Sequence, residues 1–214
     1  VGTLITDSIS GLTDGGIKLC VIGRDSSSNY QALASATEAT WTKDTGAPTA
    51  TLAGQPTGTN NITALNVTVA GSGVTHYQYK VGLSSVDCSV ATGYSADVTV
   101  GTLITNSISG LADGGIKLCV VGRDSSSNYQ ALAAATEATW TKDTGAPTAT
   151  LAGQPTGTNN ITALNVTVGG SGVTHYQYKV GLSSIDCSVV TGYSADVIVG
   201  TLITDSISGL TDGG

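Results

Sequence analysis

The sequence predicts an all-β protein made of tandem β-sandwich domains, and three observations carry this prediction. First, Val1–Thr99 and Val100–Ile198 are identical at 91 of 99 positions, so the 214-residue chain contains a repeat with a 99-residue period. Second, this period is too long for a solenoid repeat and matches a β-sandwich domain of roughly 100 residues. Third, threonine, serine, glycine and valine dominate, and short alternations of apolar and polar residues lie between turn residues.

The stretch Trp41–Leu52 recurs letter for letter at 140–151, and we interpret it as the joint between successive domains. Its centre, residues 44–48, interrupts the strand pattern. Glycine there permits a positive φ, and proline fixes its own φ and favours an extended conformation in the residue before it. The residues expected to define the two joints are Trp41, Pro48, Trp140 and Pro147.

The joints divide the chain into three parts. Residues 1–43 are the C-terminal part of one domain, residues 44–142 a complete domain, and residues 143–214 the N-terminal part of the next. We therefore expect the chain to be a segment of a longer array.

Seven strands with a period of two are expected in the complete domain, enough for a two-sheet sandwich. The most apolar of them, Ile116–Gly122, is expected to be central and packed on both faces. The alanine-rich segment Ala131–Ala135 could form a helix, but the threonines that follow it favour a strand. The expected strands are Thr49–Ala53, Ala64–Val69, Thr75–Val81, Ala96–Val100, Leu103–Ile108, Ile116–Gly122 and Tyr129–Trp140.

Charge and hydropathy exclude two classes of partner. The net charge is −7, and no cluster of basic residues occurs that could displace counterions from phosphate, so nucleic acid is not an expected partner. No apolar run approaches the roughly 20 residues that a membrane helix needs, so we expect no membrane insertion within this segment.

The order of motifs in the complete domain is informative. It runs from the turn Ala112–Gly115 through the apolar strand with Cys119, the loop Gly122–Asn128 and Trp140 to the joint Asp143–Pro147. This order resembles bacterial immunoglobulin-like and fibronectin-type-III-like repeats of large surface proteins, although Ser127-Asn128 replaces their usual Gly-Asn pair. The resemblance implies tandem seven-stranded Ig-like sandwiches at the cell surface or outside the cell.

Four cysteines, Cys20, Cys88, Cys119 and Cys187, allow three pairings. The strand that precedes Cys88 and the strand that carries Cys119 are neighbours in domains of this kind, so the resemblance implies a Cys88–Cys119 disulfide. Cys20 and Cys187 would then pair with cysteines outside the segment. The alternative is four free thiols in a reducing compartment. Zinc is not expected, because no close Cys-x-x-Cys pair occurs.

Aspartates near the joints raise the hypothesis of a calcium site, because calcium prefers oxygen ligands and the resemblance implies that some such arrays bind it at their joints. The alternative is that these aspartates form turns through hydrogen bonds to the backbone. The candidate ligands are Asp44, Asp143, Asp25 and Asp124, with Asp14 and Asp113 in the neighbouring turns.

No pattern indicates an enzyme. Asp44-Thr45-Gly46, repeated at Asp143, matches the local signature of aspartic proteases, but Thr42-Lys43 precede it in place of an apolar strand. His76 and His175 are expected on a strand surface, and no Gly-x-Ser-x-Gly motif occurs.

The expected function is structural: the stalk or fibre shaft of a bacterial surface protein, serving adhesion or filament formation, with neighbouring copies of the repeat as partners. One alternative is a module that binds a glycan or receptor, or an adhesin stiffened by calcium. Another is a fibre subunit assembled by strand donation, because residues 143–214 lack the last strands of a domain and residues 1–43 contain them.

Overall fold

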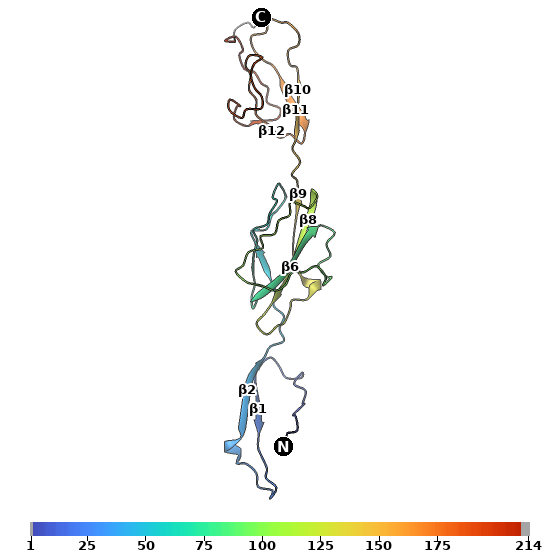
Figure 1. Cartoon of the computed structure of the whole chain (residues 1–214), viewed down its shortest axis with the longest axis vertical. Helices are drawn as coiled ribbons and strands as arrows, with labels where there is room; N and C mark the ends of the chain where they lie inside the picture. Colours follow the sequence, from blue (N-terminus) through green and yellow to red (C-terminus); the bar gives the residue numbers. More distant parts are fainter. Residues whose placement is uncertain (1, 211–214) are drawn as a thin grey trace. The chain divides into compact units, whose positions relative to one another are not determined.

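The computed structural model describes residues 2–210, in which strands and loops form several small sheets and no α-helix occurs (Figure 1). The chain divides into two compact units, residues 1–144 and 145–214. No helix in the described residues is long and apolar enough to cross a membrane. The all-β prediction is therefore confirmed.

Unit 1 begins with an antiparallel hairpin of β1 (Gly15–Val21) and β2 (Thr37–Lys43), with a 3-10 turn η1 (Leu33–Ser35) before β2. Ile17 lies opposite Trp41 in this hairpin. Because side chains two residues apart share a face of a strand, Leu19 lies on the same face as Ile17 and Trp41. This face is apolar.

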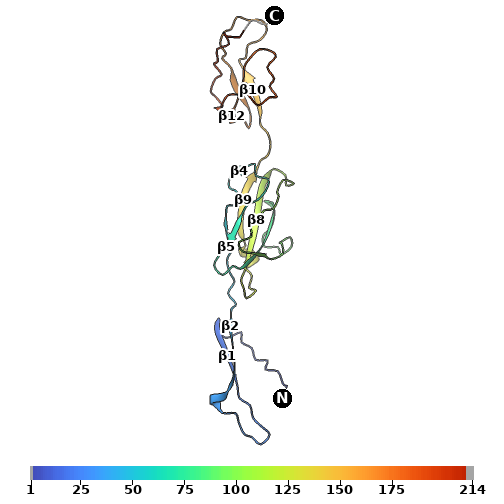
Figure 2. The same cartoon turned by 60° about the vertical axis from the view of Figure 1, so that its left-hand side comes forward.

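The remainder of unit 1, called the middle domain below, contains two sheets. A two-stranded sheet pairs β3 with β5, and a five-stranded sheet has the order β4-β9-β8-β6-β7. Figure 2 shows β8 and β9 side by side, as their antiparallel pairing requires. The strands are β3 (Thr51–Ala53), β4 (Thr59–Asn60), β5 (Thr68–Ala70), β6 (His76–Leu83), β7 (Val98–Thr99), β8 (Gly114–Arg123) and β9 (Thr136–Lys142).

Both sheets of the middle domain contribute to one hydrophobic core. Val69 of β5 packs in the same cluster as Tyr77 of β6, Leu118 of β8 and Trp140 of β9. Four consecutive residues of β8, from Leu118 to Val121, are at most 1% exposed. The prediction that this strand is central and packed on both faces is confirmed.

Three strand predictions in the middle domain are wrong in detail, and one strand was not expected. Ala64–Val69 becomes a regular strand only from Thr68, as β5. Leu103–Ile108 makes only isolated bridges, of which one pairs Ile104 with Val67. The segment Tyr129–Trp140 is interrupted by a 3-10 turn η2 (Leu132–Ala134), held by Gln130 Nε2, which donates to Ala134 O at 2.6 Å. β4 was not expected, and it pairs in parallel with β9.

Unit 2 contains four strands within its described residues: β10 (Thr148–Ala152), β11 (Thr167–Ser171), β12 (His175–Tyr176) and β13 (Val197–Ile198). β12 is the counterpart of β6, but it has two residues where β6 has eight. In the middle domain, β8 pairs with β6 along all eight residues, and the described part of unit 2 has no counterpart of β8. β12 ends after two residues because, within residues 145–210, no strand pairs with the segment that follows it.

Gly71 is required where β5 ends. Its φ is +142°, and a Cβ at this position would lie 2.2 Å from Thr49 O. Its counterpart in unit 2, Gly170, has a φ of +135° and the same conflict with Thr148 O at 2.1 Å. Glycine at this position lets the chain turn against the first strand of each domain.

Leu118 and Leu19 occupy nearly identical sequence surroundings, and they provide a matched test of the core. Leu118→Ala should destabilise the middle domain by about 2–5 kcal/mol, because Leu118 is fully buried and its removal leaves a cavity. Leu19→Ala, in the half-buried hairpin position, should cost about 1 kcal/mol or less. Urea unfolding followed by tryptophan fluorescence measures both, and equal losses would contradict the assigned core.

Candidate functional site

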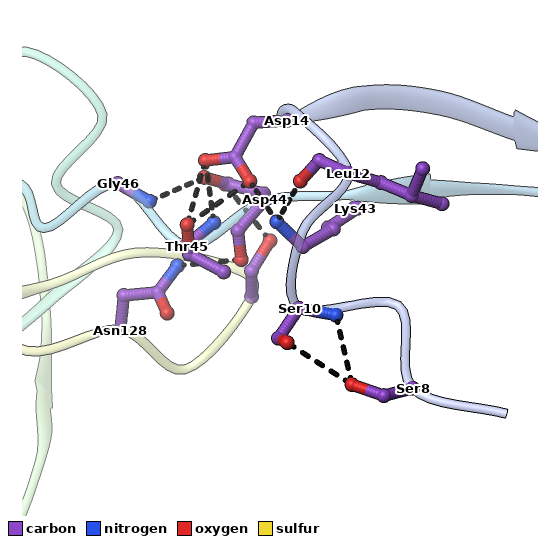
Figure 3. A network of polar contacts seen from close by, with 10 residues as sticks. Ser8, Ser10, Leu12, Asp14, Lys43, Asp44, Thr45, Gly46 and Asn128 are labelled. Carbon is purple, nitrogen blue, oxygen red and sulfur yellow. Dashed lines mark hydrogen bonds and ion pairs between the residues drawn. The ribbon is translucent and has the colours of Figure 1, made fainter. Parts of the chain in front are cut away.

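The carboxylate of Asp14 organises the joint between residues 1–43 and the middle domain (Figure 3). Its Oδ1 lies 3.1 Å from Lys43 Nζ, and its Oδ2 accepts a hydrogen bond from the backbone N–H of Thr45 at 2.9 Å. The Thr45 hydroxyl donates to the same carboxylate, and Lys43 Nζ also donates to Leu12 O at 2.6 Å. The turn before β1 is thereby tied to the linker after β2.

The same contacts occur one repeat later, at Asp113. Lys142 Nζ lies 2.7 Å from Asp113 Oδ1 and donates to Leu111 O at 3.0 Å, and the backbone N–H of Thr144 donates to Asp113 Oδ2 at 2.9 Å. The Lys142 side chain is only 4% exposed. We call this set of contacts the joint clamp, with Asp14, Lys43 and Thr45 in one copy and Asp113, Lys142 and Thr144 in the other.

At the first joint, the linker is also bound by the middle domain. Asp44 Oδ1 accepts from the N–H of Gly46 and its Oδ2 from the hydroxyl of Ser126, both at 3.0 Å. Asn128 Nδ2 donates to Asp44 O at 3.1 Å (Figure 3). It also donates to Asp124 Oδ2 at 2.8 Å. The loop between β8 and η2 therefore holds the backbone of the linker.

These contacts lower the pKa values of the clamp carboxyls. The pKa of Asp113 falls to about 2, because Lys142 and the N–H of Thr144 bind the charged form. Thr45 N–H, followed by Lys43, likewise lowers the pKa of Asp14. Both carboxylates are therefore charged throughout the physiological pH range.

The candidate calcium ligands have other partners in the structure. Asp25 Oδ1 accepts from the N–H groups of Ser27 and Asn29, and Asp124 binds Asn128 in the same way. Asp143 donates its N–H to Asn60 O at 2.8 Å. Among residues 2–210, no group of three or more His, Cys, Asp or Glu side chains is close enough to hold a metal ion. The aspartates bind the backbone and side chains of the turns and linkers.

The four residues expected to define the joints lie in different surroundings. Trp140 is 4% exposed and belongs to the core of the middle domain. Its counterpart Trp41 is 41% exposed on the hairpin. Pro48 is buried, whereas Pro147 is exposed.

Cys88 and Cys119 form a disulfide with a Cα–Cα distance of 5.5 Å, which is the pairing that the resemblance implies. The bond connects the loop after β6 to the centre of β8. Such a bond indicates a non-reducing environment. Cys20 and Cys187 are free and exposed.

Each of the two histidines has a threonine hydroxyl beside its ring. The Nδ1 atoms of His76 and His175 lie 3.1 Å from the hydroxyls of Thr75 and Thr174, the residues just before them. Thr75 and Thr174 lie just before β6 and β12, the strands that begin with these histidines.

Sequence reasoning missed a buried glutamine, Gln130, which is 5% exposed. Its Oε1 accepts from the N–H groups of Ala50 and Gly122, at 2.9 and 3.1 Å. It thereby connects the start of the domain to the end of β8. The available signal was a single amide between Tyr129 and a run of small apolar residues, where a polar side chain needs a partner.

No protein-family model and no curated protein matches the sequence. The case for a function therefore depends on the repeat, the joint clamp and the disulfide.

The joint clamp predicts a pH-dependent contribution to stability. Because the pKa of Asp113 is lowered from 3.8 to about 2 in the folded chain, its contribution is complete above about pH 4 and is lost as the pH falls toward 2. Asp113→Asn should lower the urea midpoint of the middle domain at pH 7, and the difference from the unmodified chain should shrink as the pH falls below 4 and approach zero only below pH 2.

Asp7→Asn is the matched control, because asparagine already occupies the equivalent position 106 in the second copy. It should leave the midpoint unchanged at every pH. If the Asp113→Asn and unmodified chains differed as much at pH 2 as they do at pH 7, the role of the carboxylate charge would be contradicted.

The disulfide predicts a second effect on stability. Cys88→Ser with Cys119→Ser should destabilise the middle domain by about 3–4 kcal/mol in the chain-entropy model, given a sequence separation of 31 residues. Replacing the exposed thiols of Cys20 and Cys187 with serine should leave the domain unaffected. Calorimetry of both double variants measures the melting temperature of the middle domain. An unchanged melting temperature in the variant without the disulfide would contradict the prediction.

Proposed function

We propose that the chain is a segment of a tandem array of Ig-like β-sandwich domains that serves as a stalk or shaft at a bacterial cell surface. The 99-residue repeat and the two-sheet core of the middle domain support this proposal. The disulfide supports a location outside the reducing cytoplasm.

The observation that carries the proposal is the joint clamp, which has the same contacts in both copies. In each clamp, an aspartate in the turn before β1 or β8 binds a threonine that lies two positions beyond β2 or β9. A linker held in this way loses rotational freedom close to the domain. Restricted linkers are what a shaft requires, because free linkers would let the array bend and coil.

The middle domain also contains bonds suited to resisting tension between its ends. Near its start, the carbonyls of Gly58 and Asn60 accept hydrogen bonds from the N–H groups of Thr141 and Asp143, both at 2.8 Å. These residues belong to the parallel β4–β9 pair and its flanks, so pulling residues 44 and 142 apart loads these bonds together in shear. Between Cys88 and Cys119, the disulfide prevents extension altogether.

Single-molecule force spectroscopy of the chain tests the mechanical role. With the disulfide intact, unfolding the middle domain should release less contour length than after reduction. The difference should be about 110 Å, the extended length of the 31-residue separation between the two cysteines. Unfolding without a distinct force peak in the oxidised chain would contradict a load-bearing role.

The cellular location is tested separately. Antibodies raised against the 214-residue chain are applied to intact cells of the source organism. Surface labelling without permeabilisation is expected. Labelling only after permeabilisation would contradict the extracellular part of the proposal.

A further inference from the structure

The disulfide of the middle domain is buried although it lies on the outer face of the five-stranded sheet. Leu118 and Val120 belong to the core between the two sheets, so Cys119, which lies between them in β8, faces the opposite way. Outward-facing residues of a sandwich ordinarily meet solvent. Cys119 is nevertheless 0% exposed and Cys88 3% exposed. A segment outside the core therefore covers the two sulfur atoms.

The cover is the loop that follows β6, residues 84–95, which contains Cys88. The loop has no strand of its own, and its first ten residues are exposed except for Cys88 and the half-buried Val86. Val90, for example, is 46% exposed. No residue of the loop belongs to the core cluster or packs against it. Segments with so few buried contacts open at a lower free energy than the core.

Lys80 fastens this loop to the sheet. From β6, its Nζ donates to Val90 O at 2.6 Å and to Thr92 O at 3.3 Å. The same Nζ lies 4.5 Å from the centre of the Tyr94 ring, and the Tyr94 hydroxyl donates to Cys88 O at 2.8 Å. One ammonium group thus holds the second half of the loop, and the ring that it contacts holds the cysteine.

Unit 2 repeats these contacts. Lys179 Nζ donates to Val189 O at 2.7 Å and to Thr191 O at 3.5 Å, and it lies 4.7 Å from the centre of the Tyr193 ring. The contacts of the lysine with the loop are therefore a property of the repeat. This copy also provides a matched control for substitutions of Lys80.

An open pocket of about 350 Å³ beside the loop does not reach the sulfur atoms. Its lining includes Lys80, Val86 and Val90, but neither Cys88 nor Cys119. A small thiol can enter this pocket, but a thiolate has to contact one of the two sulfur atoms for exchange to occur. The loop, in its folded position, prevents that contact.

We propose that the loop of residues 84–95 is a gate over the disulfide: thiols reduce the bond only while the loop is lifted from the sheet, and Lys80 holds the gate shut. The residues on either side of Cys88 lift while the S–S bond still holds Cys88 itself. Because the loop adds nothing to the core cluster, the core stays folded as the gate opens. The inference depends on the middle domain alone and not on a shaft role or a surface location, so either can fail alone.

The exchange begins at Cys88, because this cysteine lies on the loop that moves, whereas Cys119 lies in the central strand β8. A thiolate of dithiothreitol attacks Cys88 Sγ, the S–S bond breaks, and Cys119 leaves as a thiolate that takes up a proton. The second thiol of dithiothreitol then displaces Cys88 from the mixed disulfide and closes into a cyclic disulfide. Two electrons and two protons pass from dithiothreitol to the protein.

The test measures the rate at which dithiothreitol reduces this bond. The chain carries Cys20→Ser and Cys187→Ser, so that the two free thiols do not interfere. Alkylation of the released thiols, followed by mass spectrometry, gives the reduced fraction over time. We expect the native chain to react at least about a hundredfold more slowly than the chain unfolded in urea, because only the small open fraction reacts.

Lys80→Met should raise the rate about tenfold or more, because it removes the charged hydrogen bonds that hold the loop. Tyr94→Phe keeps the ring but loses the bond to Cys88 O, and it should raise the rate by a smaller factor. Lys179→Met removes the same contacts in unit 2 and should leave the rate unchanged. Near-UV circular dichroism of the oxidised variants shows whether the middle domain is folded.

Ile108→Ala distinguishes local opening from unfolding of the whole domain. Ile108 is 1% exposed in the core, so this substitution increases the unfolded fraction without removing a contact of the loop. It should leave the rate of reduction nearly unchanged. A rise as large as that in Lys80→Met would overturn the proposal, because the gate would then be the whole domain.

Two further results would also overturn the proposal: an unchanged rate in Lys80→Met, and a rate in the native chain equal to that in urea. The attacked sulfur is tested with reduced glutathione, which leaves a mixed disulfide that peptide mapping can locate. Glutathione is expected on Cys88. Glutathione on Cys119 would contradict the assignment of the attacked atom.

Discussion

The structure depends on the burial of one apolar hairpin face. In the middle domain, Leu118 of β8 and Trp140 of β9 lie on the same face of the five-stranded sheet and pack in the core between the two sheets. The hairpin β1–β2 has nearly the same sequence and the same register, with Ile17 opposite Trp41 as Ile116 is opposite Trp140. Val21 is nevertheless 40% exposed where Val120 is fully buried. Local sequence specifies the hairpin, and burial requires the other half of the domain.

Strand length also depends on the rest of the domain. β6 extends over eight residues because β8 pairs with all of them, whereas the nearly identical segment that begins at His175 keeps only two residues in β12. The length of a strand in this chain therefore depends on its neighbouring strand, because the neighbour provides the backbone hydrogen bonds that define the strand. Threonine and valine favour the extended conformation, but they do not decide how far a sheet extends.

The sequence was most informative where a pattern is local or repeated. The alternation of apolar residues located most strands, and the continuous apolar run 116–122 indicated the central one, which is buried on both faces. The joint clamp could not be found in this way, because Asp113 and Thr144 are 31 residues apart and meet only in the folded domain. For the same reason Trp140 was expected at the joint: its position before the linker was visible, but the inward direction of its side chain depends on the register of β9.

The clamp also has a consequence for degradation. Exposed linkers between domains are where proteases usually cut, and a trypsin-like enzyme must take a lysine or arginine side chain into a pocket that ends in a carboxylate. Lys142, the last basic residue before the linker, is 4% exposed, and Asp113 already fills the position that the enzyme's carboxylate would need. The ion pair that ties the linker to the turn before β8 thus also shields Lys142 from a trypsin-like protease.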